Sequence, residues 1–141
     1  MKKVVFIDRG NILRSPIAKA IYNSIKAGDS FAVAYGTNVV EQGNQDLLLS
    51  GYKGIADTIS VLNNHQLDIS NEKCTQLLPE HLNNVSKIIV MTEKVDIPGW
   101  LNKYNYEYWG ISNPEIVTKE VAEEIFSLLK DKVEDLISRT S

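Results

Sequence analysis

The most informative part of the sequence is Val4-Val5-Phe6-Ile7-Asp8-Arg9-Gly10-Asn11-Ile12-Leu13-Arg14-Ser15-Pro16, close to the N-terminus. Its first four residues are apolar and mostly β-branched, which is typical of a strand buried on both faces of a parallel sheet. The next four have the composition of a turn. Ser15 and Pro16 then form a helix-start signal, with the serine hydroxyl at the N-cap and the proline at the first helical position. The stretch predicts a strand, a tight loop and a helix.

The same alternation continues along the chain. Apolar residues at helical spacing predict that the first helix runs to Gly28, and residues 31–35 predict a second strand ending at Gly36. Other strands are expected at 87–91 and 106–109, and helical segments at 52–64, 70–79, 79–83, 92–100 and 117–137. Such an order predicts an α/β fold, a three-layer sandwich with a central four-stranded parallel sheet and helices on both faces.

Length and composition narrow the class of protein. The 141 residues, 43% hydrophobic and 23% charged, predict one folded domain spanning residues 1–141. The formal net charge is -3, and no block of like charges exceeds two or three residues. We therefore expect neither a nucleic-acid partner nor a membrane-surface helix. No apolar run approaches the roughly 20 residues that a membrane-spanning helix needs.

The single cysteine, Cys74, excludes an internal disulfide and a multi-cysteine metal site. It makes a cytoplasmic setting the natural expectation. The two histidines, His65 and His81, have no partners at metal-ligand spacing. We therefore expect no metal and no cofactor, while the sequence indicates no oligomeric state.

The loop between the first strand and the first helix has the chemistry of an anion site. Ligands of open parallel sheets bind at the carboxyl ends of the strands, and a helix start offers unpaired N–H groups and partial positive charge. Gly10 is expected to supply unusual backbone angles, and Asn11 tolerates left-handed geometry. We predict a phosphate-binding loop made of Arg9, Gly10, Asn11, Ile12, Leu13, Arg14 and Ser15. The alternative is an ordinary turn with a surface arginine.

The stretch resembles the N-terminal signature of the low-molecular-weight protein tyrosine phosphatases. That signature runs from an apolar strand through Cys, any residue, Gly-Asn, any residue, often a second Cys, and Arg-Ser-Pro. Weaker likenesses follow in the family's order, at residues 35–37, 67–70, 88–92 and 109–114. The resemblance implies the family's fold and its chemistry, in which a cysteine thiolate attacks phosphorus and an Asp-Pro aspartate protonates the leaving group.

The sequence departs from the family at both catalytic positions. The resemblance assigns the catalytic set to Asp8 at the nucleophile position, Arg14, and Asn113 at the general-acid position before Pro114. Leu13 stands where a second cysteine is frequent. Asparagine cannot donate and recover a proton near neutral pH, and loss of a general acid typically removes a factor of about 10² to 10⁴ in rate.

Asp8 is expected to act as a built-in phosphate mimic. Its carboxylate would accept the loop N–H groups and pair with Arg14, and these contacts should lower its pKa. Its charge would repel a phosphate dianion: two unit charges about 4 Å apart cost about 4 kcal/mol at an effective dielectric constant of about 20, roughly a 10³-fold loss of affinity. We therefore predict an impaired or inactive phosphatase-like protein, a pseudophosphatase, whose partner is a phosphorylated protein or a small oxyanion.

Two alternatives stay open at this point. One is an active phosphomonoester hydrolase that uses Asp8 as its nucleophile, for which magnesium dependence would be the sign. The other is a phosphatase inactivated in the laboratory at Asp8, Asn113 or both. Arsenate reduction, carried out by relatives of this fold, needs additional cysteines to accept electrons, and Cys74 is alone.

Overall fold

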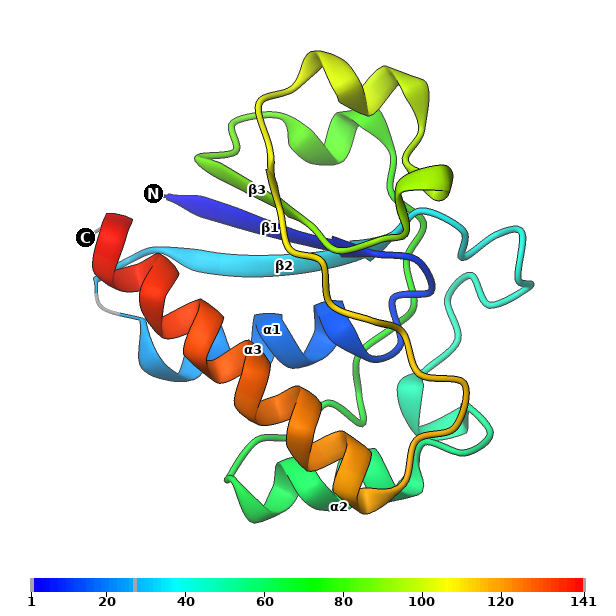
Figure 1. The fold of residues 1–141 in the computed structure, drawn as a ribbon. Helices are drawn as coiled ribbons and strands as arrows, with labels where there is room; N and C mark the ends of the chain where they lie inside the picture. The colour runs from blue at the N-terminus through cyan, green and yellow to red at the C-terminus, as the bar shows by residue number, and fades with distance from the viewer. Residues whose placement is uncertain (1, 27, 141) are drawn as a thin grey trace.

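A four-stranded parallel sheet forms the centre of the molecule, described here from a computed structural model that covers residues 2–26 and 28–140 (Figure 1). The strands lie in the order β2-β1-β3-β4. Their bounds are Lys3–Asp8 for β1, Phe31–Gly36 for β2, Lys87–Val90 for β3 and Glu107–Tyr108 for β4. All three pairings are parallel, and Asp8 lies opposite Gly36 in the register. The predicted α/β class and four-stranded parallel sheet are confirmed.

Both faces of the sheet are covered, which explains the continuous apolar run in β1. Val4 and Phe6 face a core shared with the three α-helices: α1 (Arg14–Ile25), α2 (Ala56–Asn64) and α3 (Lys119–Thr140). Val5 and Ile7 face a second, smaller core under the 3-10 helices η2 (Pro79–Leu82) and η4 (Gly99–Lys103). The predicted three layers are thus present, with the α-helices on one face and short helices on the other (Figure 1).

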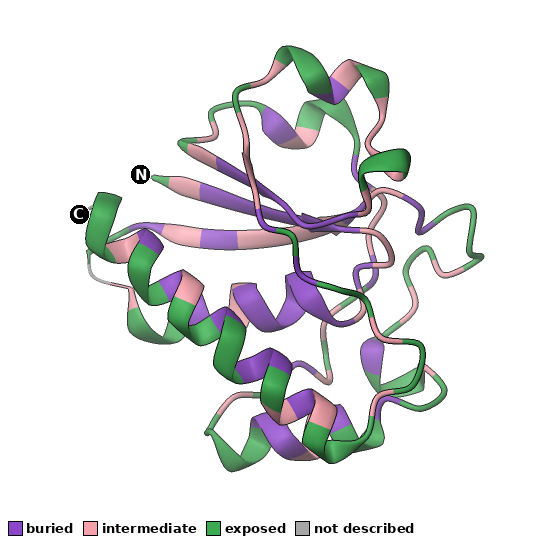
Figure 2. Ribbon diagram, viewed as in Figure 1, coloured by how far each residue is buried: buried purple, intermediate pink, exposed green. Residues whose placement is uncertain are grey.

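The burial pattern follows these layers. Figure 2 shows β1 and β3 buried along most of their length and β2 and β4 largely intermediate, whereas α3 is buried on its sheet-facing side and exposed on the other. The buried positions of α3 recur at helical spacing: Ala122, Ile125, Phe126, Leu129, Val133 and Leu136. The final helix therefore forms where its apolar spacing predicted, from 119 to 140 instead of 117 to 137.

The helix expected at 70–79 is wrong, because most of this segment pairs with distant backbone. Gly36 and Gln76 form an isolated parallel bridge, and Leu48 and Lys73 form an antiparallel one. The Cys74 amide donates to the Leu47 carbonyl at 2.8 Å. Such long-range pairing leaves no periodic signal in the sequence. Cys74 is fully buried in this extended segment and does not lie in a helix.

Three other boundaries differ for local reasons. The helix expected at 92–100 is divided into η3 (Lys94–Asp96) and η4, with Pro98, which has no N–H to donate, between them. The helix expected from residue 52 begins only at Ala56, after Gly54 with a φ of +90°. Ser15 is not the N-cap of α1, because the helix begins at Arg14 and Leu13 occupies the cap position without a side-chain hydrogen bond.

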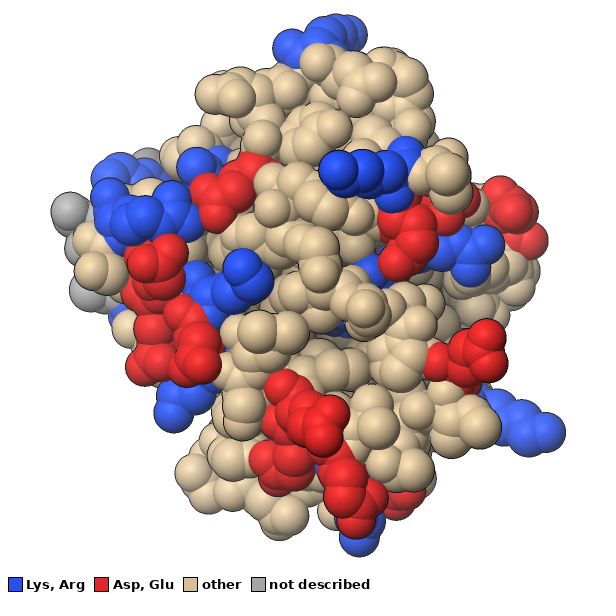
Figure 3. Space-filling view, viewed as in Figure 1, with Lys and Arg blue, Asp and Glu red and all other residues tan. Residues whose placement is uncertain are grey.

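Charges are mixed on the face viewed in Figure 3, where Lys and Arg alternate with Asp and Glu without a broad basic area. Among the described residues, no helix combines the length and apolar character needed to cross a membrane.

Candidate functional site

The predicted loop lies at the carboxyl end of β1 and forms the floor of a cavity of about 510 Å³. Asp8, Arg14 and Asn113 all line this cavity, although Asn113 lies about a hundred positions further along the chain than the other two. The segment before α2, including Tyr52 and Ile55, forms another part of the wall. The structure therefore brings together the three residues that the resemblance assigned to catalysis.

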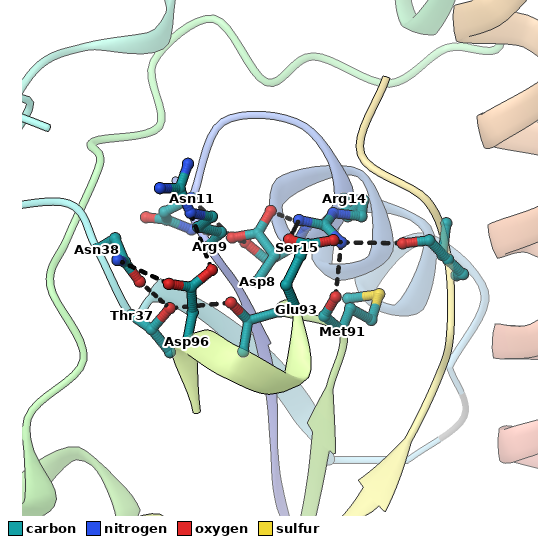
Figure 4. Close-up of polar contacts among 12 residues, drawn as sticks. Asp8, Arg9, Asn11, Arg14, Ser15, Thr37, Asn38, Met91, Glu93 and Asp96 are labelled. Atoms are coloured by element: carbon teal, nitrogen blue, oxygen red, sulfur yellow. Dashed lines mark hydrogen bonds and ion pairs between the residues drawn. The ribbon is translucent and has the colours of Figure 1, made fainter. Parts of the chain in front are cut away.

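Asp8, the last residue of β1, is held by the loop that follows it (Figure 4). Asp8 is buried, with only 1% of the residue exposed to solvent. Oδ1 accepts hydrogen bonds from the Asn11 amide at 2.7 Å and the Ser15 hydroxyl at 2.8 Å, and Oδ2 accepts one from the Ser15 amide at 3.0 Å. As predicted, the Asp8 carboxylate accepts loop N–H groups, and both of its oxygens are held in place.

The direction of the Asp8 pKa shift is opposite to the sequence-based expectation. Burial raises the pKa of this carboxyl, and its effect outweighs the opposing effects of Arg14 and of the hydrogen bonds from Ser15 and Asn11. The expectation of a lowered pKa was wrong because it counted the favourable contacts but not the loss of water around the carboxylate oxygens.

Arg14 is buried and joins three parts of the structure, so the alternative of a surface arginine is wrong. One terminal nitrogen donates to the main-chain carbonyls of Met91 at 2.6 Å and Ile111 at 2.9 Å. The guanidinium also pairs with the Glu93 carboxylate, with a closest distance of 3.0 Å (Figure 4). The expected direct pairing with Asp8 is absent. The Arg14 Nε is buried and has no hydrogen-bond partner among the described residues.

Asn11 carries the strained backbone position of the loop, with a φ of +56°. Its side chain donates to the Ser15 hydroxyl at 2.8 Å and accepts from the Thr75 amide at 2.8 Å. This role agrees with the tolerance of asparagine for left-handed geometry. Gly10, in contrast, has no positive φ, and the expectation that it supplies unusual angles was wrong. A Cβ at Gly10 would meet only side chains, the end of Gln42 at 3.0 Å and Ile12 at 3.4 Å.

Most main-chain donors of the loop remain available. Asp8 takes the N–H groups of Asn11 and Ser15. Within the part of the chain that the structure describes, no acceptor is bonded to the other N–H groups of the loop, those of Arg9, Gly10, Ile12, Leu13 and Arg14. These five residues all line the cavity, and Asn11 and Ser15 do not. The carboxylate therefore satisfies the donors behind the cavity and leaves those of the cavity-lining residues unpaired.

A second set of contacts holds the outer side of the loop (Figure 4). Arg9 Nε donates to the Asp96 carboxylate at 3.1 Å, and the same carboxylate accepts from the side-chain amide of Asn38 (Nδ2) at 3.3 Å. Thr37, next to Asn38, shares a hydrogen bond of 2.9 Å with the Thr92 hydroxyl. The ends of β2 and β3 thus fix the position of the loop that follows β1.

Gly36 allows the end of β2 to pack directly against the backbone of the loop after β1. It lies beside Asp8 at the end of β2, and a Cβ there would lie 2.8 Å from both the Arg9 carbonyl oxygen and the Asn11 amide nitrogen. It would also lie 2.6 Å from a methyl group of Val39. Because two of these neighbours are backbone atoms, the loop itself would have to move to accommodate any side chain.

Gly36→Ala is expected to lower the free energy of unfolding by about 1–3 kcal/mol, as is usual for overpacking in a well-packed interior. The displaced loop should also lose affinity for oxyanions. Urea unfolding and phosphate titration measure the two effects. Gly99→Ala is the matched control, because a Cβ at Gly99 has no neighbour within 4 Å. Equal stability of the two variants would show that the loop does not need the close approach.

Asn113 lies at the cavity, with its side chain exposed and not hydrogen-bonded to any described residue. Pro114 follows it in the loop before α3 and also lines the cavity. This is the location that the resemblance implied for a general acid. An amide there can hydrogen-bond to a ligand, but it cannot transfer a proton.

The sequence patterns did not indicate Glu93, Asp96 or Thr75 as residues of the site. Glu93 and Asp96 come shortly after the buried run 88–91, and acidic residues at the carboxyl end of a buried strand were the one available signal. Thr75 lies in the segment mistaken for a helix. The described residues contain no group of three or more His, Cys, Asp or Glu side chains placed to hold a metal ion.

Solved structures with the same fold are numerous. Wzb of Vibrio vulnificus, in complex with benzylphosphonate, superposes with a TM-score of 0.81 at 17% identity, over 98% of each chain. An arsenate reductase in its phosphate-binding state gives 0.75 at 22% over the whole of both chains. The low-molecular-weight protein tyrosine phosphatase of T. tengcongensis gives 0.74 at 19% over 99% of each chain. No family model and no curated protein matches the sequence. At these identities the likeness shows a shared fold.

Proposed function

We propose that this chain, which has the fold of the low-molecular-weight protein tyrosine phosphatases, is a pseudophosphatase that binds small phosphate-like oxyanions at residues 8–15 without hydrolysing them. The observation that carries the proposal is the Asp8 carboxylate. It stands where the resemblance places a thiolate, and three hydrogen bonds from Asn11 and Ser15 hold its two oxygens. A nucleophile must turn a lone pair toward phosphorus, and these contacts occupy three of the roughly four lone-pair positions of the Asp8 carboxylate.

The position of Asn113 supports the same conclusion. It lies at the cavity, where a leaving group would need a proton, and its amide has none to give. Binding requires neither a thiolate nor an acid. It requires donors, and the main-chain N–H groups of five loop residues at the cavity have no partner within residues 2–26 and 28–140. The residues therefore favour a protein that binds an oxyanion at this site but does not turn it over.

A second candidate is a phosphomonoester hydrolase that uses Asp8 as its nucleophile. It is favoured by one observation, that Asp8 lines the same cavity as the unpaired donors. Such an enzyme would form an acyl phosphate on Asp8. Intact-mass measurement after mixing with p-nitrophenyl phosphate and magnesium would detect this adduct, and the pseudophosphatase forms none.

The assay that tests the proposal compares turnover and binding on the same native protein. With p-nitrophenyl phosphate we expect no release of p-nitrophenol above the uncatalysed rate, with or without magnesium. Titration with inorganic phosphate, followed by calorimetry or amide chemical shifts, should show saturable binding at the loop. Turnover at the rate of a cysteine-dependent phosphatase would refute the silent site, and absence of binding at every pH would refute the oxyanion site.

The partner and the setting belong to the same proposal. A phosphorylated protein or a small oxyanion is the class of ligand that the donors of the loop would recognise, and nucleic acid is not expected. We place the protein in the cytoplasm, a setting with which a single, fully buried cysteine is consistent.

A further inference from the structure

We propose that the loop takes up its oxyanion together with one proton from solvent, and that Asp8 carries this proton in the complex. This inference rests on the proposed function, since it requires that the loop bind an oxyanion. It adds a basis for ligand selection: the site binds a tetrahedral oxyanion best when the combined negative charge of the ligand and Asp8 is low. The affinity for the oxyanion therefore rises as the pH falls.

The first step of the argument is that ligand and carboxylate occupy different places. Asp8 satisfies the N–H groups of Asn11 and Ser15, and neither of these residues lines the cavity. The five residues whose N–H groups are unpaired among the described residues do line it, and one of them, Arg14, also has a buried Nε without a described partner. An oxyanion can therefore bind to these donors while Asp8 stays in position beneath it.

The second step is that two negative groups would then face each other. Each unit of ligand charge about 4 Å from an ionised Asp8 costs roughly a 10³-fold factor in affinity at an effective dielectric constant of about 20, and a dianion carries two such units. A neutral carboxyl removes this repulsion. It also adds an O–H donor, which can point at a ligand oxygen while the other carboxyl oxygen continues to accept from the loop.

The surrounding charges offset an ionised Asp8 only in part. Arg14, whose charge favours the ionised form, shares that charge with Glu93, and Arg9 is paired with Asp96. Lys53 and Glu115, which also line the cavity, are of opposite sign. Cys74, from the extended segment behind the loop, is a neutral thiol, because burial and the charge of Asp8 raise its pKa to about 11. Asp8 is thus the group on which a proton gives the largest electrostatic benefit.

Burial favours the protonated form of Asp8. The pKa of Asp8 is already raised in the free protein by desolvation. An adjacent anion raises it further, because like charges disfavour ionisation. Binding and protonation are therefore linked, with the sign that each strengthens the other. The balance is one dianion and one proton from solvent taken up per site, with no bond broken in the ligand.

Sulfate is the probe of choice, because it stays a dianion throughout the range from about pH 5 to pH 8. Above the pKa of Asp8 in the free protein, its affinity for the native chain should fall up to about tenfold for each unit of rising pH. Calorimetry in buffers of different ionisation enthalpy should show uptake of up to one proton per sulfate bound. This second measurement needs only the native protein.

Asp8→Ser is the matched control, since a hydroxyl can accept from the loop N–H groups and does not titrate in this range. We expect it to bind sulfate more tightly than the native chain at about pH 7.5, roughly 10- to 10³-fold, with little pH dependence. His65 and His81 are retained in the variant and do not line the cavity. Any pH dependence that they cause would therefore appear in the variant as well.

The possible results separate the two proposals. If Asp8→Ser binds sulfate while the native affinity is the same at about pH 5 and pH 8, with no proton uptake, the linkage is wrong and the oxyanion site stands. If neither protein binds sulfate or phosphate at any pH, the loop is not an oxyanion site, and the proposed function fails with the inference. Proton uptake by the native chain confirms the linkage even if the variant does not fold.

Discussion

Asp8→Cys combined with Asn113→Asp is expected to turn the loop, which we propose is inactive, into a working phosphatase site, the largest change in activity that two substitutions in this chain should produce. The introduced thiol would lie at the start of α1, beside the Asn11 and Ser15 amides that now hold Asp8. Donors of this kind favour the thiolate, which is the attacking form. The introduced aspartate would lie at the cavity and supply the missing proton.

The two single variants separate the contribution of the thiol to this activity from that of the general acid. Asp8→Cys alone should form the covalent phosphoryl intermediate but turn over about 10²- to 10⁴-fold more slowly than the double variant, since it lacks the general acid. Asn113→Asp alone should remain inactive. The measurement is kcat/KM with p-nitrophenyl phosphate, together with trapping of the phosphorylated thiol. Asp8→Ser with Asn113→Asp is the control that has the acid but no nucleophile. If it matched the cysteine double variant, the turnover would not depend on the thiol.

Arg14→Ala is expected to cause the largest loss of stability of any single substitution at the site, about 2–5 kcal/mol in the free energy of unfolding. The residue is 1% exposed, and its guanidinium donates to the carbonyls of Met91 and Ile111 and pairs with Glu93. Truncation leaves these two carbonyls without their arginine donor and opens a cavity between α1 and the ends of β3 and β4. Urea unfolding measures the loss through the transition midpoint.

Arg9→Ala provides the matched comparison, because it removes an arginine from the same loop. Arg9 pairs with Asp96, but its side chain is 34% exposed, and such pairs contribute about 0–1 kcal/mol. Arg14→Lys should lie between the two alanine variants, since a single ammonium keeps the charge but cannot reproduce the planar fork. Similar midpoints for Arg14→Ala and Arg9→Ala would show that the buried network does not stabilise the fold.

The strands were the most predictable part of the molecule. The run 4–7 is apolar at every position because both faces of β1 are covered, and a continuous run is the local sign of that environment. The segment 70–78 was the least predictable, because its backbone pairs with residues 36 and 47–48, and pairing at such a separation leaves no period in the sequence. Proline and glycine positions could have corrected two of the helix starts, since Pro98 and Gly54 lie where the structure interrupts the pattern.

The strand, loop and helix at residues 3–25, the parallel α/β class, and the aspartate and asparagine at the positions that the resemblance assigned to catalysis can all be read from the sequence alone. These features follow from the order and spacing of neighbouring residues. The contacts that the loop makes could be known only from the folded structure. Arg14 reaches carbonyls 77 and 97 positions away and not Asp8, and burial raises the pKa of Asp8 where its local contacts alone would lower it. Partners and solvent exclusion depend on elements that meet only in the folded chain, and they change the loop from one filled by its own carboxylate to one with donors left for a ligand.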